Sequence, residues 1–152
     1  MNGITLCSAC RSGCNAPIME PSAWPKAFAL WVLILVLAVL NGTLRESILL
    51  PALGRFGAFV ASGTILSGCI LLVAFAAVPW YGALPARQWV AIGLFWLCLT
   101  LAFEFGFGRF LQHRSWSELL QAYTFKDGNI WPLVLVVTAV SPWLAARWRG
   151  LA

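Results

Sequence analysis

The sequence predicts an all-α fold: a polytopic membrane bundle of four transmembrane helices, with a short interfacial helix between the third and the fourth. Two observations carry this prediction. Hydrophobic residues make up 61% of the chain and charged residues only 10%, whereas soluble domains carry about 25% charged residues. The apolar residues also form long continuous runs instead of alternating with polar ones, which favours helices over a barrel.

A helix needs roughly 20 apolar residues to cross a bilayer. Four runs approach or exceed that length, and we expect them to be the spans: residues 27–44, 56–80, 88–107 and 130–146. Residues 27–149 then form the transmembrane domain, and residues 1–26 form an amino-terminal tail that we expect to be disordered.

The connections between these runs support the same topology. Residues 50–55 and 79–85 contain Pro and Gly and predict short turns. The third connection, residues 109–129, is longer. Within it Ser115 and Glu118 fit a capping box, and Leu119, Leu120 and Tyr123 follow. This pattern predicts an amphipathic helix lying on the membrane surface.

The tail contains three cysteines, Cys7, Cys10 and Cys14, and a second methionine, Met19. Three thiols suit a soft metal, but structural zinc and iron–sulfur sites want a fourth ligand. We therefore favour a tail without metal and expect no cofactor. Because Met19 opens a plausible start, we interpret residues 1–18 as an extension from an upstream start.

The net charge of +5 comes from residues between or beside the apolar runs, where they face lipid headgroups. No nucleic-acid-binding pattern is present, so the expected partners are the lipid bilayer and another membrane protein or a second copy. Basic residues divide equally between the two membrane faces. Lys26, Arg147 and Arg149 flank spans closely, which favours cytoplasmic termini.

Glu104 is the sharpest candidate for function, because an ionisable residue inside a span is costly and often functional. It lies near the carboxyl end of its helix, where the helix dipole disfavours an anion. We expect Arg45 or Arg55 to pair with it. Three roles are open: a structural salt bridge, a proton- or cation-binding group, and a carboxylate that reaches the interface.

Further polar residues fall on the same predicted membrane face. Asn41 and Arg45 are four residues apart and share one helix face. We define a polar cluster of Asn41, Arg45, Glu46, Glu104 and Arg109, with Trp116, Tyr123 and Trp131 as interfacial residues. The single histidine, His113, has no second imidazole to complete a metal site. No catalytic set is present.

The chain resembles a family of small bacterial four-helix integral membrane proteins in four motifs. They are Asn41-Gly42-x-x-Arg45-Glu46, Phe103-Glu104-Phe105-x-x-Gly108, Ser115-Trp116-x-x-Leu119-Leu120 and Gly128-Asn129-x-Trp131-x-Leu133-Val134. The resemblance covers residues 27–144. The chain departs from the family pattern at Ala122 and Thr124, which flank Tyr123, and at Asn129, where an Arg is common. The resemblance implies a location in a bacterial inner membrane and no particular activity.

Three hypotheses of function follow. The first is a non-enzymatic structural or accessory subunit, since packing faces abound and a catalytic set is missing. The second is a small oligomeric transporter or proton-coupled exporter that uses Glu104. The third, and weakest, is a membrane enzyme acting on lipid headgroups, for which a nucleophile and base are lacking.

Overall fold

The computed structural model describes residues 21–151 except 112, 114, 118–122 and 125–127. Its elements are α1 (Ala23–Leu44), η1 (Arg45–Leu49), α2 (Leu50–Tyr81), α3 (Ala86–Gly106), η2 (Phe107–Leu111) and α5 (Trp131–Trp148), where η denotes a single π-helical turn. In the part of the chain so described there is no strand. The predicted all-α class is therefore confirmed.

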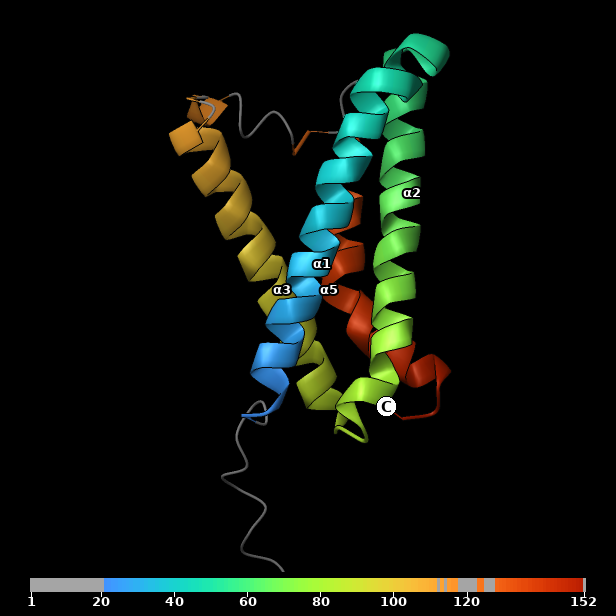
Figure 1. Cartoon of the computed structure of the whole chain (residues 1–152), viewed down its shortest axis with the longest axis vertical. Helices are drawn as coiled ribbons and strands as arrows, with labels where there is room; N and C mark the ends of the chain where they lie inside the picture. Colours follow the sequence, from blue (N-terminus) through green and yellow to red (C-terminus); the bar gives the residue numbers. More distant parts are fainter. Residues whose placement is uncertain (1–20, 112, 114, 118–122, 125–127, 152) are drawn as a thin grey trace, which may run out of the picture.

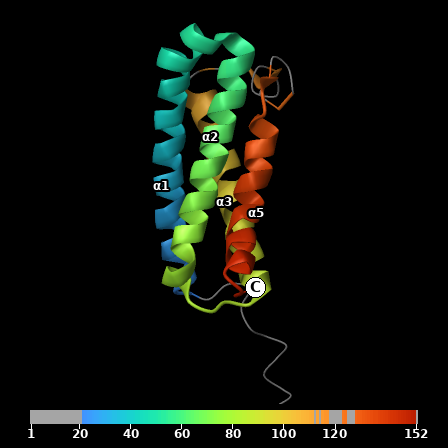
Figure 2. The ribbon, with the colours of Figure 1, turned by 90° about the vertical axis from the view of Figure 1, so that its right-hand side faces the viewer.

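Three helical segments are long and apolar enough to cross a membrane: Ala23–Tyr81, Ala86–Phe110 and Trp131–Trp148. The first segment contains both α1 and α2 and folds back on itself, so that these two helices lie side by side (Figures 1 and 2). Long apolar helices are what the composition predicts for a membrane protein.

The reversal between α1 and α2 differs in detail from the predicted turn over residues 50–55. The chain stays helical through η1 and the first residues of α2, and the helix breaks at Gly54, which has φ 68° and ψ 176°. Glycine accepts this conformation because it has no Cβ. Pro51, which has no N–H to donate, lies just after η1, and the helical N–H before it, that of Leu50, donates to the Arg45 carbonyl.

The helices run alternately up and down, and both ends of the described chain lie at the same end of the bundle (Figure 1). We call this the termini end; it contains the start of α1 and of α3 and the last turns of α2 and α5. The opposite end, the turn end, contains η1, η2 and the start of α5. Helix α5 packs against both α2 and α3.

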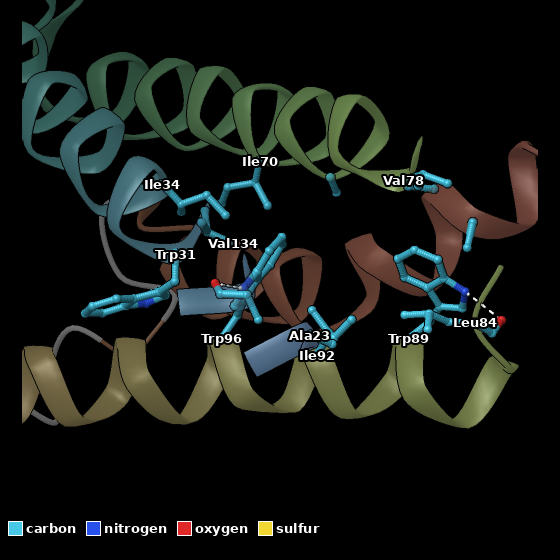
Figure 3. Close-up of a cluster of buried hydrophobic side chains, with 14 of the residues drawn as sticks. Ala23, Trp31, Ile34, Ile70, Val78, Leu84, Trp89, Ile92, Trp96 and Val134 are labelled. Carbon is cyan, nitrogen blue, oxygen red and sulfur yellow. Dashed lines mark hydrogen bonds between the residues drawn. The ribbon is translucent and has the colours of Figure 1, made fainter. Parts of the chain in front are cut away.

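Tryptophans fill much of the interior (Figure 3). Trp96 is fully buried and donates its indole N–H to the Ala27 carbonyl over 2.8 Å, which joins α3 to α1. Trp89 is 1% exposed and donates to the Leu84 carbonyl over 3.1 Å. An aromatic residue near a helix start can thus point inward and satisfy its N–H there.

The outer surface is apolar, as a lipid solvent requires. Large hydrophobic side chains point outward along every long helix; the most exposed in α2 is Leu72, at 70%. Others are Phe28, Val36 and Val39 on α1, Leu94 on α3 and Val136 on α5. In water such a surface would be an aggregation hazard.

Two glycines allow helices to approach closely. A Cβ on Gly93 of α3 would collide with the backbone carbonyl of Ala139 on α5, so this crossing tolerates only glycine. A Cβ on Gly63 of α2 would lie 2.5 Å from the side chain of Ile130. These two contacts set how α5 lies between α2 and α3.

Two sequence predictions fall largely outside the described residues. They are the disordered tail with Cys7, Cys10, Cys14 and Met19, and most of the surface helix, including Glu118, Leu119 and Leu120. Of that helix the structure describes Trp116 and Ser117, which are helical, and Tyr123, which lies in a turn.

Candidate functional site

Glu104 lies half-buried in the last turn of α3, at the turn end. One of its carboxylate oxygens, Oε2, accepts a hydrogen bond from the Tyr123 hydroxyl and another from the Trp131 indole N–H, each over 2.9 Å. A single carboxylate oxygen therefore joins α3 to the following connection and to the first residue of α5. We call Glu104, Tyr123 and Trp131 the carboxylate triad.

Aromatic rings surround the triad. Tyr123 stacks on Phe105 with ring centroids 5.8 Å apart and an interplanar angle of 3°. Phe105 also contacts the exposed Trp116, at 6.2 Å between centroids. This packing reduces the access of water to the triad, and hydrogen bonds to a charged group gain strength where water is scarce.

Tyr123 donates to Glu104, and its surroundings keep it a donor. Burial, and then the charge on Glu104 and the hydrogen bond to it, raise the pKa of the Tyr123 hydroxyl above its ordinary value. The phenol therefore keeps its proton at every pH at which an exposed tyrosine would.

Trp131 is held in place by the start of α5. Its backbone N–H donates to the Asn129 side-chain oxygen over 3.0 Å, which satisfies one of the N–H groups that a helix leaves open at its start. Pro132 follows at a position where no N–H is needed. These local features fix the backbone from which the indole reaches Glu104.

A small cavity of about 30 Å³ lies between α1, α2, α3 and α5, and Trp131 forms part of its wall. Such a volume holds about two water molecules at most. The lining is mostly apolar, with hydroxyls from Thr100 and Thr138; the other lining residues are Trp31, Ile34, Leu35, Ala38, Leu66, Ile70 and Val134.

One face of α3 carries polar groups every fourth residue, at Trp96, Thr100 and Glu104. Thr100 accepts a hydrogen bond from the Trp31 indole over 3.1 Å and donates to the Trp96 carbonyl over 2.8 Å. Each of the three side chains therefore bonds to α1 or α5. The sequence analysis missed Trp31, Trp96 and Thr100, although the spacing of four residues was visible in it.

Asn41 and Arg45 have their contacts within the α1–α2 hairpin. The Asn41 amide nitrogen donates to the Ser62 hydroxyl over 2.7 Å and to the Ser62 carbonyl over 3.1 Å. Ser62 is 2% exposed. The Asn41 side-chain oxygen is buried without a hydrogen-bond partner.

Arg45 does not show the expected pairing with Glu104. Its guanidinium forms a salt bridge with Glu46 over 3.1 Å and lies 4.8 Å from the centre of the Phe59 ring. A carboxylate next to it in sequence competes better than one on another helix. The hydrogen bonds described for Asn41, Arg45 and Glu46 thus lie in the α1–α2 hairpin, whereas those described for Glu104 come from Tyr123 and Trp131.

The remaining candidates lie at the surface of the turn end. Arg109 is exposed, and so is His113, which has a positive φ of 52°. Within the described residues no three His, Cys, Asp or Glu side chains are grouped so that they could hold a metal ion.

The fold and these contacts define a class: an all-helical protein whose long apolar helices suit a membrane and whose interior includes polar side chains that hydrogen-bond between helices. Comparison with known protein families, with curated proteins and with solved structures finds no match to the chain.

Proposed function

We propose that the chain is a multi-pass protein of a bacterial inner membrane, which α1, α2, α3 and α5 cross four times with both termini in the cytoplasm. The reversal of the Ala23–Tyr81 segment supports two crossings by α1 and α2 (Figure 2). Lys26, Arg147 and Arg149, which flank spans at the termini end, support the orientation. Labelling of Ser22→Cys and Ser47→Cys variants in intact cells tests it: only the second should react with an impermeant thiol reagent.

Within that membrane the proposed role is a non-enzymatic structural or accessory subunit. The observation that carries this proposal is that four interior side chains form hydrogen bonds between helices. Trp31, Asn41, Trp96 and Glu104 each hydrogen-bond to a group on a neighbouring helix. Groups used to join helices stabilise the bundle, and the hydrogen bonds that these four side chains make between helices need no substrate. The role requires no cofactor and no nucleic acid.

Native mass spectrometry of the tagged protein, purified in mild detergent, tests this role. We expect a reproducible complex with another membrane protein, or a complex of several copies of this chain. A protein that stays monomeric from mild extraction onward, while it turns over a lipid headgroup, would contradict the proposal and favour an enzyme.

A transporter that uses Glu104 is the second candidate, because one observation favours it. Trp131 both binds the Glu104 carboxylate and lines the cavity between the helices. Protonation of the carboxylate would therefore alter the hydrogen bond of a side chain that forms part of the cavity wall. The small volume of the cavity favours a proton or a small cation over an organic substrate.

Proteoliposomes containing a pH-sensitive dye separate the two candidates. A transporter predicts a proton flux that Glu104→Gln abolishes and that the exposed-carboxylate control Glu46→Gln leaves intact. If the protein is a subunit without transport activity, neither the unaltered protein nor Glu104→Gln nor Glu46→Gln should give a proton flux greater than that of empty liposomes.

A further inference from the structure

The termini end carries basic side chains that lie against aromatic rings. The Arg149 guanidinium lies 4.1 Å from the centre of the Phe75 ring, and the Lys26 ammonium lies 5.8 Å from that of Trp80. Lys26 also donates a hydrogen bond to the Trp80 carbonyl over 2.9 Å. Both contacts are with the last turns of α2, so this helix positions one cation from α1 and one from the end of α5.

Two further basic residues belong to the same end. Arg147 lies 5.7 Å from the centre of the Trp143 ring on its own helix, and Arg87 is exposed at the start of α3. An aromatic face orients a cation without neutralising it. We call Lys26, Arg87, Arg147 and Arg149 the basic collar.

The two ends of the bundle differ in their acidic residues. The two carboxylates within the described part of the chain, Glu46 and Glu104, both lie at the turn end, where Glu46 pairs with Arg45. In that same part, the collar has no carboxylate beside it. Among the residues that the structure describes, the positive charge of the collar is therefore not paired with a carboxylate.

The exposed tryptophans at this end show which anion fits. Trp24, Trp80 and Trp148 are 43%, 52% and 62% exposed. Indole rings prefer the depth of the lipid headgroups. Basic side chains beside them lie at the level of the phosphodiester groups, which a guanidinium binds through two parallel hydrogen bonds.

We propose that the basic collar is a binding surface for anionic phospholipids, which it holds by their phosphodiester headgroups around the termini end. Charge complementarity selects anionic over zwitterionic lipid, and the acyl chains lie along the exposed apolar faces of the helices. The attraction weakens as ionic strength rises.

Native mass spectrometry of the delipidated full chain in detergent tests this proposal. The protein is titrated with phosphatidylglycerol and, separately, with phosphatidylcholine of the same acyl chains. We expect stronger retention of phosphatidylglycerol, and we expect Lys26→Gln/Arg149→Gln to lower it about fivefold for each charge removed. Lys26→Arg/Arg149→Lys should retain the preference, because both charges remain.

The matched control is Arg45→Gln/Arg55→Gln, which removes two basic residues from the turn end, one of them also stacked on an aromatic ring. An equal loss of phosphatidylglycerol in this control would overturn the proposal, and so would equal retention of the two lipids by the unaltered protein. Full displacement of the lipid by inorganic phosphate would also overturn it, since the surface would then be a general anion site. If the Gln variant fails to fold, the lipid preference of the unaltered protein and of the Lys/Arg exchange decides.

Discussion

The Trp131 indole donates its hydrogen bond to the Glu104 carboxylate over 2.9 Å and thereby ties the first residue of α5 to the last turn of α3. Tyr123 donates to the same oxygen from the connection between these helices. The bond is thus part of a three-way junction, and its loss should be measurable as a loss of stability.

We expect Glu104→Ala to lower the free energy of unfolding by about 1–3 kcal/mol, because two charge-assisted hydrogen bonds disappear and two donors lose their acceptor. Glu104→Gln keeps a neutral acceptor oxygen and should cost about half as much. Thermal unfolding in detergent measures both. The control Glu46→Ala breaks only an exposed ion pair and should change stability by about 0.5 kcal/mol or less; a larger loss there than in Glu104→Ala would contradict the assignment.

Tyr123 should titrate well above the ordinary tyrosine pKa of 10.0. The chain has two tyrosines, so a Tyr81→Phe variant reports on Tyr123 alone through the ultraviolet absorbance of tyrosinate. Because the folded-state pKa is raised, the unfolded chain releases this proton first, and the protein loses stability as pH rises above 10.0.

Adding Glu104→Gln to that variant should lower the pKa of Tyr123 again, since the neighbouring negative charge is gone. Part of the shift should remain, because burial is its largest cause. A titration midpoint at the ordinary value in the Tyr81→Phe protein would show that Tyr123 does not lie against Glu104.

Gly93→Ala should destabilise the packing of α3 on α5. Its methyl group would meet the Ala139 carbonyl, which is backbone and can move only with the whole helix. We expect a loss of about 1–3 kcal/mol or a failure to fold. Gly68→Ala is the matched control, because no atom lies within 4 Å of the added methyl; it should be neutral or slightly stabilising.

Asn41 and Ser62 should be energetically coupled. Asn41→Ala and Ser62→Ala each remove the 2.7 Å hydrogen bond between their side chains. A double-mutant cycle on thermal stability should give a coupling of about 0.5–1.5 kcal/mol. Thr64→Ala in place of Ser62→Ala should give none, because the Thr64 hydroxyl bonds within its own helix, to Val60.

The sequence predicted the helical segments well because lipid imposes a simple rule on them: long apolar runs must satisfy their own backbone. The predicted run 88–107 corresponds to α3 at Ala86–Gly106, and the run 130–146 to α5 at Trp131–Trp148. The π-helical turn η1 and the helical start of α2 were missed. Both depend on which glycine breaks the helix. Gly54 breaks it, whereas the nearby Gly42 and Gly57 stay helical, and the sequence does not distinguish between them.

The partners of Glu104 were harder to predict than Glu104 itself. A buried carboxylate calls for a donor, and charge alone favours an arginine. The donors observed are an indole and a phenol, which lose less hydration energy than a second ion when they are buried. Which side chains reach Glu104 also depends on how α5 is placed along α3. That placement follows from the Gly93–Ala139 contact, which sequence spacing does not reveal.

The separation of these hydrogen-bonding partners along the chain has a consequence for biosynthesis. Ser62 follows Asn41 by 21 residues, so the hydrogen bond between them, which joins α1 to α2, can form once α2 has left the ribosome. The Trp131 indole that binds Glu104 is synthesised 27 residues after it, and Thr100 is synthesised 69 residues after its partner Trp31. We therefore expect a nascent chain halted before Trp131 to have a closed first hairpin and a third helix whose carboxylate lacks its indole donor. A membrane chaperone or a quality-control protease would act on that state.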